Sequence, residues 1–387
     1  MKPNTLHALL DAAVDGGGLA GVVGLLASRG EVSFEYAAGR RALGAAQPMT
    51  ADTVMWIASM TKAVTSIAAM QCVERGLLQL DVPVSRWVPE IDEVPVLTGF
   101  DSAGCAILRP AARSPTLREL LLHTGGCAYE FLDADLARYF ELHKVPPGAS
   151  GAHATLMRPR VADPGVRWDY GIGLDWAGRA VEAATGRRLG DAFREQIFEP
   201  LGMQHSAFRL SAAMRENLAG MHARKPDGEL IGLRFEVNQA ADHDMGGHGL
   251  YSTPREFLRL LRMLLRGGEL DGRRLLSAAT VAAMSGDQLG ALRLPAGIRS
   301  VDRRLSNDIG FRDDGRNGWG LSFLVELADV PGGRRAGSYS WAGLCNSHYW
   351  IDPASDRVGL LMTQVLPFFD APTTALLQQF ESAAYDP

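Results

Sequence analysis

One serine and one lysine stand three residues apart in a stretch that is otherwise mostly apolar. Ser59 and Lys62 belong to the segment TVMWIASMTKAVTSIAAMQCVERG, residues 53–76. Side chains three residues apart on a helix lie on one face, with β-carbons about 5–6 Å apart, so the lysine amine can approach the serine hydroxyl. A serine with an adjacent base is the arrangement that nucleophilic attack on a carbonyl carbon requires.

Lysine is rare in this chain, which draws attention to Lys62. Of 39 basic residues only four are lysines: Lys2, Lys62, Lys144 and Lys225. Arginine cannot act as a base at any usable pH, whereas the pKa of a lysine falls when the amine is desolvated or lies beside another cation. We therefore expect Lys62 to be the base. The alternative is a serine N-cap followed by a solvated lysine in the first turn.

The stretch around this pair has the periodicity of a helix. Apolar residues recur at steps of three and four, at Ala63, Val64, Ile67, Ala68 and Val73. The pattern predicts a helix with one buried face that ends near Gly76. Ser59 is then expected at or near the helix N-terminus, where unpaired N–H groups and the positive end of the dipole collect.

The two ends of the chain are rich in strand formers and the middle is mostly helical. A helix is expected over residues 4–15 after an Asn cap, a hairpin over 21–40, four short strands over 319–327, 336–343, 347–352 and 357–365, and a last helix over 371–385. Strands at both ends that enclose a helical middle predict an α+β fold, in which one antiparallel sheet is built from both chain ends and flanked by terminal helices. A mainly helical lobe is inserted, and the cleft between the two lobes is the expected site.

We expect residues 1–58 and 318–387 to form the sheet lobe and residues 59–317 the helical lobe of one catalytic unit. Within the helical lobe a capping box at Thr116–Glu119 opens a short helix, further helices are expected over 172–185, 189–203 and 254–268, and the helix over 189–203 should stop at Pro200 and Gly202. Residues 81–115 are expected to be loop, with a surface excursion at 99–104. Residues 286–317, rich in Arg, Asp and Gly, are expected to be a long loop that acts as a lid.

Composition limits the classes of partner. The net charge is −5 and the sequence pI is about 6.0, which argues against nucleic acid or an anionic membrane because no basic stripe attracts phosphate. No apolar run is longer than residues 18–27, so no transmembrane helix is expected. Aspartates near the N-terminus argue against a signal peptide and make the cytoplasm the expected location. The four cysteines, Cys72, Cys105, Cys127 and Cys345, have no metal-binding spacing, and free buried thiols are expected.

Beyond Ser59-x-x-Lys62, several segments are typical of one known group of proteins. They are LRELLLHTGG (117–126), EPLGM (199–203), GGHGLYSTPREF (246–257) and WAGLCNSHYWIDP (341–353). With them the chain resembles, over nearly its whole length, the serine β-lactamase and penicillin-binding-protein-like superfamily. Within it the chain is similar to the carboxylesterases that resemble class C β-lactamases, the family VIII esterases. The resemblance implies a β-lactamase/transpeptidase-like fold and an acyl-enzyme mechanism.

The resemblance also implies a catalytic tyrosine. Family members place one after a Pro-Gly turn, which in this chain is Pro164-Gly165 followed by Tyr170. Such a phenol can relay a proton between the serine and the leaving group if a nearby ammonium keeps its pKa low. The alternative is an aromatic packing residue before a helix. The lactamase pattern is Tyr-x-Asn, but here Ile172 stands where the asparagine would hold a lactam side chain.

The third family motif departs from the lactamases as well. Lactamases have Lys-Thr-Gly on a strand beside the serine, and this chain has Trp341-Ala342-Gly343, as the related esterases do. Gly343 should let a substrate approach the strand backbone, and the N–H groups of Leu344 and Ser59 would form the oxyanion hole. Trp341 cannot pair with a β-lactam carboxylate, which favours neutral esters as substrates.

Two competing kinds of site find little support in the sequence. Asp242, His243, Asp244 and His248 fit no zinc or calcium spacing, so neither a metal nor another cofactor is expected. His123 could serve as a triad base, but the chain contains no Gly-x-Ser-x-Gly segment, which argues against an α/β-hydrolase.

The sequence therefore predicts a serine hydrolase that cleaves small-molecule carboxylic esters of short to medium acyl chain. Alternatives with the same chemistry are a β-lactamase, a D-amino-acid peptidase or amidase, and an acyltransferase in which a second alcohol outcompetes water. A different class is a non-catalytic acyl- or peptide-binding protein on the same fold.

Overall fold

One seven-stranded antiparallel sheet organises the computed structural model, which describes residues 3–311 and 315–386. The strand order is β13-β14-β15-β16-β17-β1-β2, so β1 near the N-terminus pairs with both β2 and the C-terminal strand β17. This confirms that both chain ends build one sheet. The strands are β1 (Gly21–Ala27), β2 (Val32–Gly39), β13 (Asn317–Trp319), β14 (Leu324–Glu326), β15 (Tyr339–Gly343), β16 (Ser347–Asp352) and β17 (Arg357–Met362).

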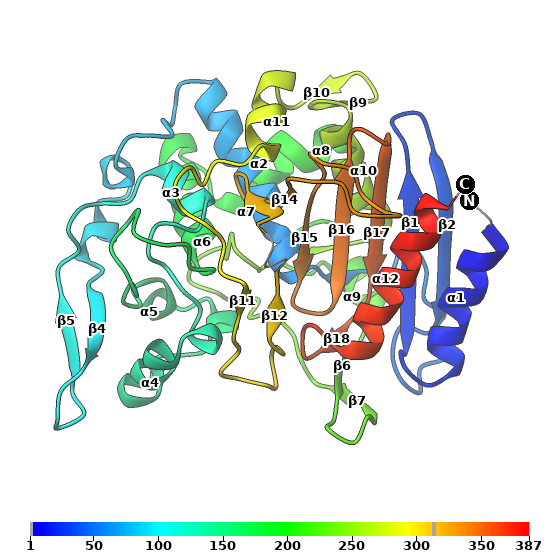
Figure 1. The fold of residues 1–387 in the computed structure, drawn as a ribbon, viewed down its shortest axis with the longest axis horizontal. Helices are drawn as coiled ribbons and strands as arrows, with labels where there is room; N and C mark the ends of the chain where they lie inside the picture. Colours follow the sequence, from blue (N-terminus) through cyan, green and yellow to red (C-terminus); the bar gives the residue numbers. More distant parts are fainter. Residues whose placement is uncertain (1–2, 312–314, 387) are drawn as a thin grey trace.

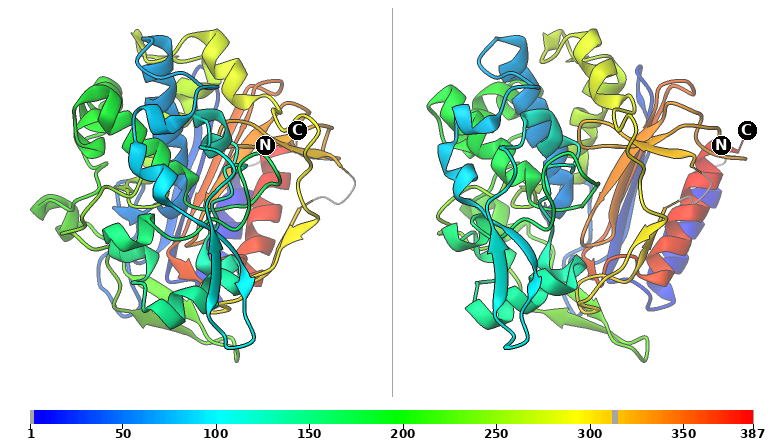
Figure 2. Two further views of the ribbon diagram at one scale, coloured as in Figure 1. Left: turned by 90° about the vertical axis from the view of Figure 1, so that its left-hand side faces the viewer. Right: turned by 60° about the vertical axis from the view of Figure 1, so that its left-hand side comes forward.

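The two terminal helices lie together on one face of this sheet, as Figures 1 and 2 show. They are α1 (Pro3–Asp15) and α12 (Ala371–Tyr385). They bury apolar side chains against the strands, α1 its leucines and α12 a leucine and a phenylalanine, in a layer made of Leu6, Leu10, Leu376 and Phe380 with Val22, Leu26, Trp350 and Leu361. This layer contributes packing to the fold.

The other face of the sheet carries α10 (Pro254–Leu265), α2 (Thr61–Glu74) and the rest of the helical part of the chain. The expectation that α2 has one buried face is wrong, because every residue from Thr61 to Cys72 is buried. The helix passes through the middle of the molecule, between the sheet and α6 (Gly173–Thr185), and so has protein on all sides. A helix buried all round needs no amphipathic pattern, and the three- and four-residue spacing of α2 marked only part of its buried surface.

The helices expected after Thr116 and over 172–185, 189–203 and 254–268 are present, whereas α4 (Ala134–His143), α5 (His153–Leu156), α9 (Ala212–Glu216) and α11 (Ala278–Ser285) were not predicted from the sequence. Thr116 and Glu119 form the predicted capping box of α3 (Leu117–Leu121). Pro200 does not stop the helix over 189–203: it is accommodated after a π-helical turn, and the helix ends at Gly202, whose φ is +65°. The other helical elements here are α7 (Leu189–Phe193), η6 (Arg194–Phe198) and α8 (Glu199–Leu201), with single turns η2 (Val84–Arg86), η3 (Pro89–Glu93), η4 (Glu130–Leu132) and η5 (Gly148–Ser150).

Two segments differ from the sequence-based expectation. Residues 96–109, expected to be loop, form a hairpin of β4 (Val96–Phe100) and β5 (Ala106–Arg109), joined by a turn in which Asp101 accepts backbone N–H groups. Residues 319–327, expected to be one strand, instead contain the end of β13, a turn at Ser322 with a φ of +79°, and β14. Both hairpins are too short to show a period of two in the sequence.

The described residues of the segment 286–317 lie in front of the seam between the sheet and the helices (Figure 1). It holds two short paired strands, β11 (Gly297–Ile298) and β12 (Ile309–Gly310), and residues 312–314 of the expected lid lie outside the described range. The backbone of Val301 donates to Phe131 on the helical side, and that of Asn307 donates to Phe368 near the sheet. The lid role of this segment and the lobe boundaries at 58/59 and 317/318 stay predictions.

Short strands complete the structure away from the main sheet. They are β3 (Met55–Trp56) paired with β8 (Tyr251–Ser252), β6 (Met221–Arg224) with β7 (Leu230–Leu233) and β18 (Val365–Leu366), and β9 (Glu269–Leu270) with β10 (Arg273–Arg274). All four cysteines are free: Cys72, Cys127 and Cys345 are buried as expected, but Cys105 is exposed in the β4–β5 hairpin. No helix in the described ranges is long and apolar enough to cross a membrane.

Candidate active site

Ser59 lies in a short turn between strand β3 and helix α2. The turn is the 3-10 helix η1 (Ala58–Met60), and Ala58 has a φ of +46° although it carries a side chain. This left-handed conformation costs about 1 kcal/mol for a residue other than glycine and persists only where the surroundings impose it. Here the N–H of Ile57 donates to the carbonyl of Leu250, and the N–H of Leu250 donates to the Thr61 hydroxyl. Ser59 is thus held on a turn that is fixed on both sides.

Strand β15 ends against the same turn. A β-carbon on Gly343 would lie 2.4 Å from the carbonyl oxygen of Ile57, so only glycine permits this approach. The structure therefore gives Gly343 a different reason from the expected one, because the backbone that comes close is the protein's own. Ser59 lies in η1 and Leu344 directly follows β15, so their N–H groups belong to the two elements that meet here. Their role as oxyanion donors stays a prediction.

Lys62 is fully buried and touches only uncharged acceptors. Its Nζ lies 3.2 Å from the Ser59 Oγ, 2.9 Å from the Tyr129 hydroxyl and 2.8 Å from the Gly247 carbonyl oxygen. A neutral amine has two hydrogens and one lone pair. If Tyr129 and Gly247 accept the two hydrogens, the lone pair is left for the Ser59 hydroxyl proton. The geometry is that of a base aimed at a nucleophile.

Burial sets the protonation of this amine. Desolvation lowers the pKa of Lys62 from 10.5 to about 7, and the carboxylate of Asp175 works in the opposite direction. A substantial fraction of the lysine is then neutral at pH 7, which is the form that can accept a proton. A base whose pKa lies near the working pH is the most effective general base.

Tyr170 lies on the other side of the serine. Its hydroxyl accepts a hydrogen bond of 2.9 Å from the Trp341 indole N–H and is hydrogen-bonded to Ser59. Burial nevertheless raises the pKa of Tyr170, with the two hydrogen bonds opposing the rise. The condition that a nearby ammonium keeps this pKa low is therefore not met: burial raises the pKa of Tyr170, and Lys62, with a pKa of about 7, is charged only in part near neutral pH. Tyr170 is therefore a neutral phenol that can donate a proton or pass one on.

Tyr129 was not singled out from the sequence, although it contacts Lys62 directly. Its N–H donates to the carbonyl of Tyr170 at 3.3 Å, so the two tyrosines come from crossing segments. A β-carbon on Gly171 would lie 2.2 Å from the Cys127 carbonyl oxygen at this crossing. Glycines at a close crossing form no recognisable spacing in the sequence. The one feature that could have indicated this crossing was a single glycine, Gly171, next to Tyr170.

The expected specificity residues take two different positions. The Trp341 side chain packs against the Tyr170 ring, with centroids 5.0 Å apart, and against Trp319 at 4.6 Å. Its indole N–H donates to the Tyr170 hydroxyl, so the rest of the ring presents apolar surface to a substrate. Ile172 precedes α6 and is 3 % exposed within the core, which leaves little of its side chain for a substrate to touch.

Several cavities lie near this group of residues, among them one of about 410 Å³ that is lined by Tyr170, Trp168 and residues between 292 and 299. Another, of about 1080 Å³, is largely apolar and is lined among others by Phe131, Phe140, Phe235, Val301 and Leu305. Phe131 stacks on Tyr129 with centroids 5.3 Å apart, and Leu305 belongs to the same apolar cluster as Leu344. The segment 286–317 contributes to the walls of both cavities.

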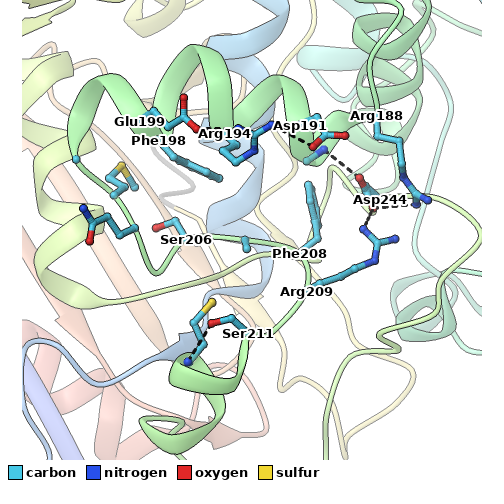
Figure 3. Close-up of a pocket in the computed structure, with 16 residues that line it drawn as sticks. Arg188, Asp191, Arg194, Phe198, Glu199, Ser206, Phe208, Arg209, Ser211 and Asp244 are labelled. Carbon is cyan, nitrogen blue, oxygen red and sulfur yellow. Dashed lines mark hydrogen bonds and ion pairs between the residues drawn. The ribbon is translucent and has the colours of Figure 1, made fainter.

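A third pocket, of about 540 Å³, lies away from the serine (Figure 3). At one end Asp244 accepts hydrogen bonds from Arg188, Arg209 and the N–H of Gly190 at 3.2, 3.0 and 2.9 Å. Asp242 accepts the N–H of His153. The acidic residues weighed as metal ligands are thus partners of arginines and backbone, and Ser59, Lys62 and Tyr170 do not line this pocket.

Comparison with known proteins agrees with this fold and site. The model of the beta-lactamase family matches residues 6–381. Lovastatin esterase of Penicillium rubens is 35% identical over 95% of this chain and 94% of its own length. Monacolin J acid methylbutanoyltransferase of Aspergillus terreus is 35% identical over 87% of this chain and 83% of its own.

A solved structure of simvastatin synthase from Aspergillus terreus, unliganded, superimposes with a TM-score of 0.85 at 30% identity, covering 100% of this chain and 98% of that one. The family match and these relatives place the chain among the serine acyl-transferring enzymes of the β-lactamase-like kind. The chain belongs to the beta-lactamase family. The predicted β-lactamase/transpeptidase-like α+β fold is confirmed.

Proposed function

We propose that the protein is a carboxylic-ester hydrolase that acts through an acyl-enzyme on Ser59. The observation that carries the proposal is the lysine geometry: a buried amine with a pKa of about 7 lies 3.2 Å from the Ser59 Oγ, and its other two partners, the Tyr129 hydroxyl and the Gly247 carbonyl, are uncharged. The related lovastatin esterase supports ester cleavage as the reaction.

The proposed reaction has two halves. Ser59 Oγ attacks the ester carbonyl as its proton passes to Lys62, and the N–H groups of Ser59 and Leu344 bind the oxyanion. The carbon–oxygen bond to the alcohol then breaks, and the proton held by Lys62 passes through Tyr170 to the leaving oxygen, which returns Lys62 to its neutral form. Water attacks the acyl-enzyme as its proton passes to Lys62. The bond to Ser59 Oγ then breaks as that proton passes to the serine oxygen, which releases the acid and restores the Ser59 hydroxyl.

Simple esters are proposed as better substrates than β-lactams. The Trp341 indole N–H donates to Tyr170, and Ile172 is apolar. The groups of the lactamase pattern that would bind a lactam carboxylate and amide side chain are therefore missing at these two positions. Each hydrogen-bonded or ionic contact of this kind is worth roughly 1.5–3 kcal/mol. We expect kcat/KM for short to medium acyl esters to exceed that for penicillins by at least about a hundredfold.

The test is a panel of acyl esters run beside penicillins and a chromogenic cephalosporin, with the wild-type protein and Ser59→Ala. Ester hydrolysis that disappears in a folded Ser59→Ala protein supports the proposal. Turnover unaffected by this substitution would overturn it, and a β-lactam efficiency equal to the ester efficiency would favour the lactamase alternative. Labelling of Ser59 by a phosphonate separates an enzyme from a non-catalytic binding protein.

Acyl transfer to an alcohol is a second candidate. It is favoured by the apolar cavity of about 1080 Å³ beside the site, which is large enough for an acceptor of drug size, and by the relatives named as acyltransferases. Product analysis with one ester donor in the presence and absence of an added alcohol measures the partition between water and alcohol. The cytoplasmic location stays a prediction, and cell fractionation is the experiment that tests it.

A further inference from the structure

Behind Lys62 lies a buried carboxylate that the proposed mechanism does not use. Asp175, in the first turn of α6, is 2 % exposed. Its Oδ1 accepts the N–H of Gly247 at 3.1 Å, and the carbonyl of the same glycine accepts the Lys62 amine at 2.8 Å. The carboxylate therefore acts on the lysine through a single residue.

The packing around Gly247 leaves no freedom in this arrangement. A β-carbon on Gly247 would lie 2.5 Å from Asp175 Oδ2 and 3.0 Å from the Tyr129 hydroxyl. The carboxylate and the phenol that binds Lys62 thus converge on one glycine. Oδ2 is buried without a hydrogen-bond partner among the described residues. His248 Nδ1 lies 3.9 Å from Oδ1, and burial lowers the pKa of this histidine, which favours its uncharged form.

The segment that carries Gly247 is held at its other end by a second buried carboxylate. Asp244 binds Arg188, Arg209 and the Gly190 N–H (Figure 3). Between the two, the Thr65 hydroxyl donates to the carbonyl of Gly246 at 2.6 Å. Asp175 lies near the lysine, whereas Asp244 is paired with arginines. Residues 244–247 are thus held by two buried carboxylates, Asp244 within the segment and Asp175 on α6.

We propose that Asp175 is a positioning residue for the acyl-transfer reaction: it fixes the Gly247 carbonyl against Lys62 and supplies the negative charge that balances the ammonium formed when Ser59 gives up its proton. The inference rests on the proposed function, in which Lys62 receives that proton. No arginine or lysine forms an ion pair with Asp175 in the described ranges.

The charge has two opposite effects on the reaction. Asp175 opposes the desolvation that lowers the pKa of Lys62, so its removal should lower that pKa further and leave the base neutral in more acidic solution. It also stabilises the ammonium in the transition state, so its removal should slow the reaction wherever the base is already neutral. The other titratable or charged groups around Lys62 and Asp175 are Tyr129, Tyr170, His123, His243, His248 and Arg158.

Asp175→Asn separates charge from shape, because an amide oxygen can still accept the Gly247 N–H. In the pH profile of kcat/KM, the acidic limb is the rise with pH that precedes the plateau. For Asp175→Asn we expect this limb to move to lower pH by about one unit and the plateau value to fall at least about tenfold. Asp175→Glu keeps the charge and should keep the limb near its wild-type position. Asp244→Asn is the control: it loosens the same segment and should leave the limb in place.

A purely structural role for Asp175 predicts a lower plateau with an unmoved limb, and that result would overturn the inference. Asp175→Ser replaces the Asn variant if that protein does not fold, with the same displacement expected. A readout without turnover is the NMR titration of the lysine side chains, since four lysines give few signals. An equal Lys62 titration in wild type and Asp175→Asn contradicts the inference, whereas a wild type that lacks Ser59-dependent hydrolysis contradicts the proposed function instead.

Discussion

Two buried ionisable groups at the two ends of residues 244–247, the Asp244 carboxylate and the Lys62 amine that binds the Gly247 carbonyl, have opposite surroundings. Asp244 sits between two arginines and a backbone N–H, each of its contacts compensating its charge. Lys62 is fully buried beside a hydroxyl, a phenol and a carbonyl, none of which carries a charge. Pairing keeps a buried group ionised, and burial without a pair drives it towards its neutral form. The contrast separates a group that holds the fold from one that can exchange a proton.

The strongest way to break this contrast is to make the lysine permanently charged. Lys62→Arg keeps the charge but cannot release its proton, and we expect kcat/KM for esters to fall by about 10³-fold or more, nearly as far as in Lys62→Ala. Steady-state hydrolysis with both variants measures this. Activity rescued by arginine would mean that position 62 acts only through its charge.

The same contrast should appear in stability. The pKa of Lys62 is about 7 in the folded protein and 10.5 when unfolded, so between these values the unfolded state binds more protons. The free energy of unfolding of the wild type should therefore rise with pH from 7 to 10, relative to Lys62→Met, by an amount on the order of 3 kcal/mol.

Urea unfolding at pH 6, 8 and 10 measures this difference. Asp244→Asn is the comparison. Its free energy of unfolding should be lower than that of the wild type by about 2 kcal/mol, because charged hydrogen bonds are lost, and this difference should not change with pH. Parallel pH curves for wild type and Lys62→Met would show that the lysine is not neutral when folded.

A smaller effect is expected on the tyrosine side of the serine. Trp341→Phe keeps an aromatic ring against Tyr170 but removes the 2.9 Å hydrogen bond to its hydroxyl. Losing one such bond is worth about 1 kcal/mol, so kcat should fall roughly fivefold to tenfold with KM changing less. A change confined to KM would instead make Trp341 a substrate-binding residue alone.

Much of the fold could be predicted because local patterns agree with the final structure. The β1–β2 hairpin, the capped helix α3 and both terminal helices have signals within a few residues of one another. The sheet of both chain ends followed from strand-rich segments at the termini. Two of the predictions that failed concern α2 and the segment 96–109. The helix α2 is buried on all sides, which is a property of what surrounds a helix. The hairpin of β4 and β5 is too short to show the two-residue period of a strand.

The site shows the same division. Ser59 and Lys62 share one helical turn, so spacing alone brought them together, and Tyr170 followed from a family resemblance. Tyr129 and Asp175 reach Lys62 from other elements, 67 residues away in one case. Their contacts depend on glycines where backbones cross, at Gly171 and Gly247. The pKa of Tyr170 could not be predicted either, because it depends on how far the whole site is buried.

The central claim is that Lys62 is a neutral base at Ser59, and the rate of phosphonate labelling of Ser59 against pH tests it most directly. Labelling followed by intact-protein mass from pH 5 to 10 reports proton removal from the serine without product release. We predict a rate that rises with pH, is half-maximal near pH 7, and disappears in Lys62→Met. A rate that is flat across this range, or half-maximal near pH 10, would contradict the account.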